Sequence, residues 1–283
     1  MSKQPPDKVK ELPDGSIIQH GPLNDRIYLM KVGNSLPRSL PSDLVKMAER
    51  HEYSKIFVKI PADYSKQFVR EGYIEEASIP RFFNGAIAGV FMGYYLDEER
   101  ASEPDAADIK KILRLAFNKS GSTNESLDKE LFRLHRCKEE DVEIMATIYK
   151  KVFQTYPFPI HDPLFLKDSM QSNVDYFGIE KNGRLIALSS AEIDVTSQNV
   201  EMTDFATLPK WRGNSLGVHL LLRMEKEMKK KGIRTAYTIA RAKSAGINIT
   251  FSKLGYELGG RLKNNTNISG NIESMNIWHK TIC

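Results

Sequence analysis

The sequence predicts a mixed α/β protein built in two parts. Helix-like and strand-like patterns alternate along most of the 283 residues, a length that suits about two domains. A polar segment divides a shorter N-terminal part from a longer C-terminal part, where a loop of small residues joins a predicted strand to a predicted helix. With 41% hydrophobic and 27% charged residues, the composition is that of a globular protein and excludes wholesale disorder.

The N-terminal part, residues 1–117, is predicted to form a small α/β domain. It ends in a polar stretch at 97–108 and a short amphipathic helix at 109–117. Residues 118–129 are almost entirely polar and are the predicted linker. The predicted strands are 26–32, 55–60 and two more between 74 and 95, and the predicted helices are 42–50 and 64–70.

The C-terminal part, residues 130–283, continues the alternation with more strands. Residues 181–184 carry a hairpin signal, and Gly232 stands where a glycine commonly ends a helix. The predicted strands are 131–136, 176–180, 185–194, 200–207, 235–241, one from 256 and one at 273–280, and the predicted helices are 139–153, 165–170, 216–231 and 246–253.

The two parts contain similar segments. Residues 68–73 and residues 251–256 both read as a helix end followed by glycine and tyrosine, and each follows a strand and precedes a strand-rich stretch. A duplicated half-domain is one explanation. The other is that helix-glycine-aromatic is a common way for a chain to leave a helix.

Charge and composition limit the cellular setting. The net charge of +5 is mild, and the basic stripe of a nucleic-acid-binding protein is missing, so we expect no nucleic-acid partner. The N-terminal residues lack the apolar core of a signal peptide, and the longest apolar stretch, 85–96, is too short to span a membrane. Cys137 and Cys283 suit a reducing cytoplasm and suggest no metal cluster. We therefore expect a cytoplasmic protein without a metal.

The segment 207–217 is the strongest candidate for a binding site. Small or flexible residues allow the backbone to curl around a ligand, and the helix that follows offers unpaired N–H groups and the positive end of its dipole to an anion. Arg212 adds a fixed positive charge. An ordinary strand-to-helix loop that uses glycine to turn is the alternative.

This segment resembles motif A of the GNAT superfamily of acetyl-CoA-dependent N-acetyltransferases, whose pattern is Arg/Gln-x-x-Gly-x-Gly/Ala. Arg212, Ser215 and Gly217 fall on its three marked positions, with Ser215 in place of the first glycine. The order of predicted elements over 131–280 is also similar to that of the family. The resemblance implies that acetyl-CoA is the cosubstrate. Its pyrophosphate would meet the backbone of Arg212, Gly213, Asn214, Ser215, Leu216 and Gly217, and its pantetheine arm would follow Phe205, Ala206 and Thr207.

A second family motif, a helix followed by Lys-x-Gly-aromatic, is similar to residues 253–256. Asn248 lies on that helix, where it either hydrogen-bonds the CoA arm or is simply a solvated helix residue. Many relatives carry a tyrosine as general acid at the position of Phe251, and a phenyl ring donates no proton. Tyr237 or Tyr256 is a possible substitute, and a CoA thiolate also leaves readily without one.

Acetyl transfer to an amine requires a proton acceptor, because only about one in 2,500 lysine-like ammonium groups is neutral at pH 7. By its place on the strand before the loop, Glu201 matches the glutamate base of the family. Strict strand alternation puts Asp204 on the opposite face, unless a bulge turns it inward to bind the substrate ammonium. The alternative for both is a solvated strand residue.

The loop 156–163 occupies the position that walls the acceptor site in the family. Tyr156 and Phe158 suit the aliphatic stem of an amine and Asp162 suits its ammonium, unless the loop is merely stiff. This loop, residues 201–207 and the N-terminal extension resemble the branch of β-lysine N-epsilon-acetyltransferases. The branch implies the acceptor β-lysine, supplied by a lysine 2,3-aminomutase, and a compatible solute as the product.

Several alternatives stay open. The acceptor is β-lysine, another small amine or a protein lysine, and a non-catalytic acyl-CoA sensor fits the departures at Phe251 and Ser215. The substrate carboxylate needs a partner, for which Arg81, Arg241 and Lys243 are candidates. The N-terminal part is a lid over the substrate, a cover for apolar surface, or a surface that mediates a homodimer.

Overall fold

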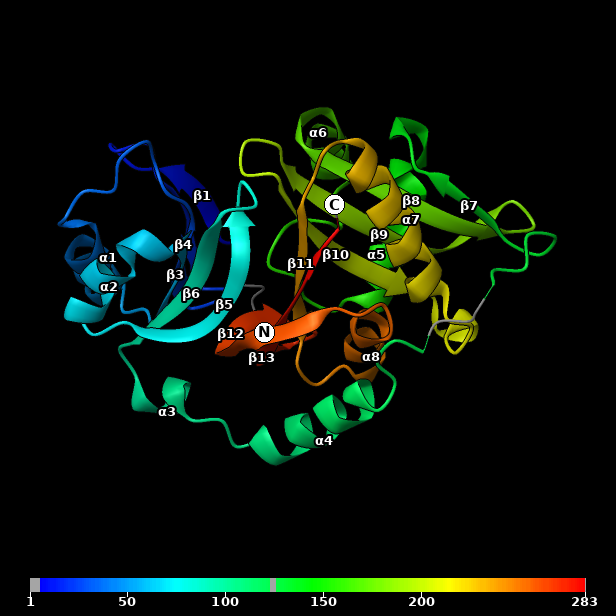
Figure 1. The fold of residues 1–283 in the computed structure, drawn as a ribbon. Helices are drawn as coiled ribbons and strands as arrows, with labels where there is room; N and C mark the ends of the chain where they lie inside the picture. The colour runs from blue at the N-terminus through cyan, green and yellow to red at the C-terminus, as the bar shows by residue number, and fades with distance from the viewer. Residues whose placement is uncertain (1–5, 123–125, 283) are drawn as a thin grey trace.

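A computed structural model describes residues 6–122 and 126–282 of the chain. A single mixed sheet runs through the whole molecule, which confirms the mixed α/β class (Figure 1). Its strands lie in the order β1-β2-β3-β4-β6-β5-β12-β13-β11-β10-β9-β8-β7. The strands are β1 (Lys8–Glu11), β2 (Ile17–Gly21), β3 (Arg26–Lys31), β4 (Lys55–Pro61), β5 (Ile74–Phe83), β6 (Ile87–Tyr95), β7 (Arg133–Arg136), β8 (Val174–Lys181), β9 (Arg184–Asp194), β10 (Asn199–Thr207), β11 (Thr235–Arg241), β12 (Glu257–Ile268) and β13 (Asn271–Thr281).

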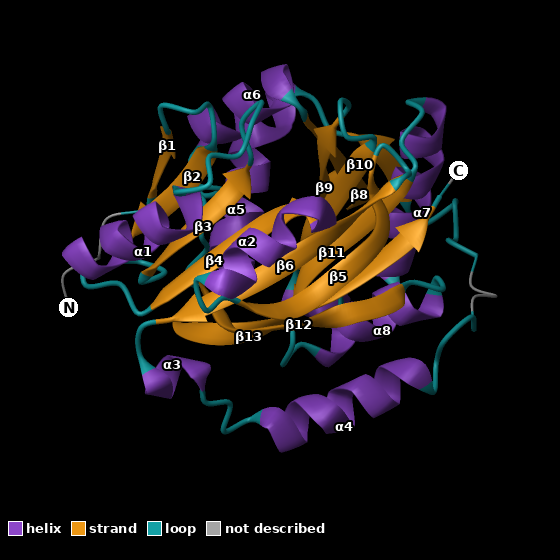
Figure 2. Ribbon diagram, turned by 60° about the vertical axis from the view of Figure 1, so that its left-hand side comes forward, coloured by secondary structure: helices purple, strands orange, loops and turns teal. Residues whose placement is uncertain are grey.

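Helices cover the sheet on both faces, and α4 lies along α8 in both views (Figures 1 and 2). No helix of the described residues is long and apolar enough to cross a membrane. The helices are α1 (Leu40–Arg50), α2 (Ser65–Arg70), α3 (Glu98–Ala101), α4 (Ala106–Phe117), α5 (Val142–Val152), α6 (Pro163–Ser172), α7 (Leu216–Lys230) and α8 (Ala245–Lys253), with 3₁₀ turns at Ala62–Tyr64, Glu139–Asp141 and Pro209–Trp211.

The two halves of the sheet repeat one arrangement. In the N-terminal half the order is β3-β4-β6-β5, with α1 between β3 and β4 and α2 between β4 and β5. In the C-terminal half the order is β10-β11-β13-β12, with α7 and α8 in the same places. The first pair of each half is parallel and the others are antiparallel. A duplicated half-domain predicts this repetition, whereas a common type of helix exit does not account for it.

The halves join edge to edge where β5 meets β12, with Ala77 opposite Gly260. Gly260 has a φ of +144°, and a Cβ there would lie 2.6 Å from the Cα of Ala77. Only glycine combines this backbone conformation with such a close approach. The sheet is thus continuous between the two parts, and the division of the chain into domains at 117 and 130 stays a prediction.

Three clusters of buried side chains stabilise this sheet. One lies between the N-terminal strands and α1, and another between the C-terminal strands, α7 and α8. The third contains residues of both halves, including Tyr28, Phe57 and Phe91 with Met145 and Tyr149. The face of each half-sheet that does not pack against α1 or α7 therefore contributes to one shared core. The candidate site lies beside this core.

Most predicted elements are present, with boundaries shifted by one to three residues. The hairpin signal is confirmed, because Asn182 and Gly183 have φ values of 51° and 72° between β8 and β9. The sequence missed β1, which is wholly exposed, and β2, which is only five residues long. The predicted linker is a turn at its start, and its residues 123–125 lie outside the described residues.

Candidate active site

The site begins with a bulge in β10. Its antiparallel pairing with β9 is regular as far as Thr203, and resumes with a shifted register at Ala206. Between them Asp204 adopts a left-handed conformation with a φ of 53°, which an aspartate tolerates better than most residues. Strict alternation would turn Asp204 away from Glu201, but the bulge brings both residues to the wall of the same cavity.

The same strand parts from its other neighbour. Strand β10 pairs in parallel with β11 only from Asn199 to Glu201, and beyond these residues the two strands, both fully described, do not pair with each other. A cavity of about 1380 Å³ adjoins this opening. It extends from the loop before α7 to the inner face of β3 and β4, so that both halves of the molecule line it.

Three carboxylates gather in this cavity: Glu192 on β9, and Glu201 and Asp204 on β10. Burial raises the pKa of all three, and the neighbouring charges of Glu201 and Asp204 raise that of Glu192 further. Asp204 accepts hydrogen bonds from the hydroxyl of Tyr156 and from Ser190 Oγ, the latter at 2.6 Å. These bonds act against burial by stabilising the charged form.

The N-terminal half contributes a cation to this acidic cluster. Lys59 Nζ on β4 donates a hydrogen bond to the hydroxyl of Tyr237 at 3.2 Å, and Tyr237 donates to Glu201. Burial alone would lower the pKa of Lys59, but Tyr28, Glu201 and Glu192 outweigh it, and the pKa lies above the ordinary value. Lys59 therefore stays protonated, and its positive charge stabilises the charged forms of Glu192 and Glu201.

The sequence reasoning missed Lys59, Tyr28 and Glu192. A signal was available for Lys59, because strand alternation along β4 puts it on the face opposite the apolar residues Val58 and Ile60. Nothing local showed that this face would lie over a strand more than 140 residues away.

The loop before α7 has the predicted form. Gly213 and Ser215 have φ values of 85° and 53°, and α7 begins at Leu216 without a side-chain cap from Ser215. The N–H groups of Leu216 and Gly217 have no acceptor among the described residues, whereas that of Val218 donates to the carbonyl of Ser215 at 2.9 Å. A Cβ on Gly213 would meet no atom within 4 Å, so the loop leaves open space for a ligand. The residues of 205–217 that line the cavity are Phe205, Thr207, Trp211, Arg212, Gly213, Ser215, Leu216 and Gly217.

Two residues of this segment that were predicted to bind acetyl-CoA, Ala206 and Asn214, do not line the cavity. Ala206 is buried in the shared core. The Asn214 side chain donates to the carbonyl of Trp211 at 3.0 Å, so it supports the loop from within. The loop nevertheless combines open space, free N–H groups and Arg212, and these features fit the pyrophosphate of acetyl-CoA.

Two predicted site residues have other roles in the structure. The amide of Asn248 is fully buried and donates to the carbonyls of Arg241 and Ser244, and its oxygen accepts from Asn276 and Trp278. Because its NH2 group and its oxygen are already hydrogen-bonded within the protein, Asn248 has no group left to bind the CoA arm. It is not a solvated helix residue either. Asp162 is exposed and caps α6 by accepting from the backbone N–H of Leu164 at 3.0 Å, so it does not face the acceptor.

The loop that contains Asp162 still forms part of the wall. Tyr156 and Phe158 both line the cavity, and their contact with the acceptor stays a prediction. Gln19, from β2, donates to the carbonyl of Pro157 at 2.9 Å and ties this loop to the N-terminal half. Among the possible substitutes for a tyrosine at Phe251, Tyr237 faces the cavity and Tyr256 does not.

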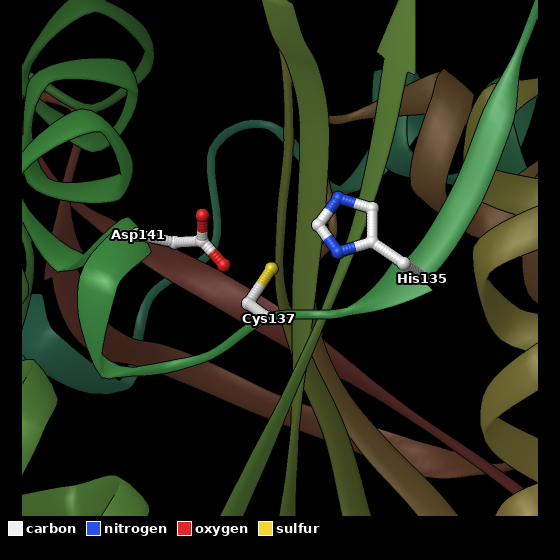
Figure 3. A group of neighbouring side chains, drawn as sticks. All are labelled: His135, Cys137 and Asp141. Atoms are coloured by element: carbon white, nitrogen blue, oxygen red, sulfur yellow. The ribbon is translucent and has the colours of Figure 1, made fainter. Parts of the chain in front are cut away.

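A group of possible metal ligands lies elsewhere. Figure 3 shows His135, Cys137 and Asp141 at the end of β7, with the sulfur between the ring and the carboxylate. The sequence reasoning did not foresee this grouping. Burial raises the pKa of the Cys137 thiol to about 12, so the thiolate that a metal requires is disfavoured. Asp141 accepts from the backbone N–H of Lys138 at 2.8 Å, and none of the three lines the cavity.

Comparison with known proteins agrees with this site. Residues 140–256 match the acetyltransferase (GNAT) family. The chain is 40% identical to a protein named beta-lysine N(6)-acetyltransferase from Methanococcus maripaludis, over 97% of this chain and 98% of the relative. A protein of the same name from Methanosarcina mazei is 33% identical, over 83% and 94%. N-acetyltransferase YodP from Bacillus subtilis is 31% identical, over 94% and 96%.

The chain therefore belongs to the GNAT family of acetyltransferases. It is an N-acetyltransferase that uses acetyl-CoA, as the resemblance of the loop implied.

Proposed function

We propose that the protein transfers the acetyl group of acetyl-CoA to the side-chain amine of β-lysine. The observation that carries the proposal is the cluster of Glu192, Glu201 and Asp204 in a cavity that the N-terminal half helps to line. Buried carboxylates with raised pKa values favour a cationic ligand, and a substrate with two ammonium groups supplies the missing charge. The names of the two archaeal relatives support the same acceptor.

In this proposal Glu201 removes the proton from the substrate ammonium, directly or through water. Burial raises its pKa above that of an ordinary glutamate, which makes its carboxylate a stronger base. Asp204, held by Tyr156 and Ser190, binds the ammonium and directs it. The neutral amine then attacks the thioester carbon, the carbon–sulfur bond breaks, and the second proton that the nitrogen loses passes to the leaving CoA thiolate.

Leaving-group assistance falls to Tyr237 in the absence of a tyrosine at position 251. Its pKa is raised well above the ordinary value by burial and by Glu201, so its hydroxyl keeps its proton. This single O–H donates to Glu201 in the structure, and it becomes available to the CoA thiolate once Glu201 has taken up the proton of the substrate. The loop from Arg212 to Gly217, together with Phe205 and Thr207, binds acetyl-CoA.

The N-terminal half acts as the wall of the acceptor pocket. Tyr28 and Lys59 line the cavity, and Gln19 holds the Tyr156 loop in place. A cavity closed from two sides suits a free amino acid better than a lysine within a protein chain. As the resemblance to the β-lysine acetyltransferases implies, a lysine 2,3-aminomutase would supply the substrate in the cytoplasm, and the product would be a compatible solute.

The decisive experiment measures CoA release from acetyl-CoA with purified protein and one acceptor at a time. β-Lysine, α-lysine, spermidine and a lysine-containing peptide are the acceptors. A clear preference for β-lysine supports the proposal, and a preference for another acceptor replaces β-lysine while leaving the chemistry in place. Binding of acetyl-CoA without release of CoA for any acceptor would support a sensor instead.

A further inference from the structure

A second charged feature of the cavity is not used by the proposed reaction. Arg26, the first residue of β3, lines the cavity and is only 3% exposed. Within residues 6–122 and 126–282, no carboxylate forms an ion pair with it. Burial of this charge lowers the pKa of the guanidinium to about 10. A buried charge without a counterion is costly and seldom retained without a reason.

The other buried cations of the N-terminal half differ in this respect. Lys55 Nζ lies 2.8 Å from Glu76 Oε2, and Arg100 Nη1 lies 3.3 Å from Asp25 Oδ2. Neither Lys55 nor Arg100 lines the cavity. Lys59 does line the cavity, but Glu201 and Glu192 raise its pKa, so it is matched by the acidic cluster. Among these buried cations, Arg26 alone lines the cavity without a neighbouring carboxylate of that cluster, as far as the described residues show.

The hydrogen bonds of Arg26 hold it in place without neutralising it. Its Nη1 donates to the carbonyl of Asn265 and, at 3.1 Å, to Thr266 Oγ1. Its Nε is buried and has no hydrogen-bond partner in the described part of the chain. A guanidinium offers donors in a fixed plane that matches a carboxylate, so the arrangement is oriented and still able to bind an anion.

The position of Arg26 relates it to the acidic cluster. Along β3, Arg26 and Tyr28 share the inner face, and the guanidinium carbon lies 5.3 Å from the centre of the Tyr28 ring. The phenol of Tyr28 is hydrogen-bonded by Lys59, which faces Glu201. The cavity thus has an anion-binding end at Arg26 and an ammonium-binding end at Glu201 and Asp204, with an aromatic side chain between them.

The other cations considered for a substrate carboxylate are less suitable. Arg241 lines the cavity, but its Nη2 lies 2.7 Å from Glu273 Oε1. Lys243 forms an ion pair with Asp105. Arg81 is exposed and lies outside the cavity wall.

We propose that Arg26 binds the carboxylate of the amino-acid acceptor and thereby selects the amine farthest from it for acetylation. The inference rests on the proposed function in taking an amino acid as the acceptor. With the carboxylate held at Arg26, the terminal ammonium of an extended substrate reaches the acidic cluster. Arg26 is then a specificity-determining residue that contacts substrate without taking part in proton transfer.

The test compares acceptors that differ only in the carboxylate. 1,4-Diaminopentane is β-lysine without its carboxylate, and 1,5-diaminopentane is α-lysine without it. In Arg26→Gln, we expect kcat/KM to fall about 100-fold for the amino acids, mainly through KM, since a hydrogen-bonded charge pair is lost. Activity with the two diamines is expected to stay at the wild-type level. Arg26→Lys keeps the charge without the planar fork, and is expected to lie between wild type and Arg26→Gln.

Arg100→Gln is the matched control, because it removes another buried arginine that lies outside the cavity. We expect it to affect all four acceptors alike. Acetyl-CoA affinity in each variant shows whether the protein is folded. Equal losses on amino acids and diamines in Arg26→Gln, or a wild-type enzyme that prefers the diamines, would overturn the inference. The choice between β-lysine and α-lysine by the wild-type enzyme tests the proposed function separately.

Discussion

At the scale of single residues, the chemistry depends on one backbone angle. Glu201 and Asp204 are three positions apart in a strand, so regular alternation would place them on opposite faces. The left-handed conformation of Asp204 brings them to one cavity, and its carboxylate is fixed there by Ser190 and Tyr156. The sequence reasoning allowed for such a bulge. Which of these two carboxylates acts as the base is open to direct test.

Replacing the proposed base is the first test. In Glu201→Gln the side chain keeps its shape but accepts no proton, so we expect kcat at neutral pH to fall by about 10²- to 10⁴-fold. Steady-state CoA release measures this, and unchanged acetyl-CoA affinity serves as the folding control. Asp162→Asn alters a carboxylate of the same predicted site that is exposed and caps α6, and we expect near-normal kcat. A Glu201→Gln variant with wild-type turnover would exclude Glu201 as the base.

The pH dependence follows from the directions of the pKa shifts. A base works only when deprotonated, and burial raises the pKa of Glu201, so kcat/KM is expected to fall as the pH drops through this raised pKa. The charge of Asp204 also raises that pKa. In Asp204→Asn we therefore expect the acidic limb to move to lower pH, together with a lower maximum rate. A limb that stays in place or moves to higher pH would show that another group controls it.

At the scale of elements, the loop before α7 departs from the family pattern at one residue. Ser215 stands where the GNAT pattern has glycine, and it adopts the left-handed conformation that glycine would adopt freely. Ser215 therefore takes a backbone conformation that the glycine of the pattern would also allow. Glycine at this position would remove strain, and a β-branched residue would add to it.

This gives a prediction for acetyl-CoA binding. We expect Ser215→Gly to bind acetyl-CoA at least as tightly as the wild type, since the backbone conformation is retained without a Cβ. Ser215→Val is expected to bind about tenfold more weakly, because about 1–2 kcal/mol of left-handed strain disfavours the binding loop. Titration calorimetry measures both affinities. Tighter binding by Ser215→Val than by Ser215→Gly would mean that the strain is unrelated to binding.

The elements also show what sequence reasoning can and cannot reach. Periodicity located most helices and strands because one face of each is buried, and the loop of α7 was found because its chemistry is local. Asp162 was misjudged although the signal was present, because aspartate followed by proline is typical of a helix start. Asn248 was misjudged because its four partners come from the end of β11, the start of α8 and strand β13, and no local pattern relates β13 to it.

At the scale of the molecule, the site depends on both halves of one sheet. Arg26, Tyr28 and Lys59 approach a cavity whose carboxylates lie on β9 and β10, and no sequence pattern indicates a contact over that separation. The shared core contains residues of both halves, and β5 pairs with β12. An N-terminal part that only covered apolar surface would not need charged residues facing the cavity.

This continuity predicts that the halves unfold together. Both tryptophans, Trp211 and Trp278, belong to the C-terminal half, whereas far-ultraviolet circular dichroism detects both halves. We therefore expect one thermal transition, with the same midpoint by fluorescence and by circular dichroism.

In Gly260→Ala the added Cβ meets the backbone of Ala77 in a glycine-only conformation. We expect the free energy of unfolding to fall by about 2 kcal/mol, with the two midpoints still coincident. Gly183→Ala, in a hairpin turn where a Cβ meets no atom within 4 Å, controls for backbone strain alone and is expected to lose less. A dichroism step without a matching fluorescence change would instead mean that the N-terminal half unfolds on its own.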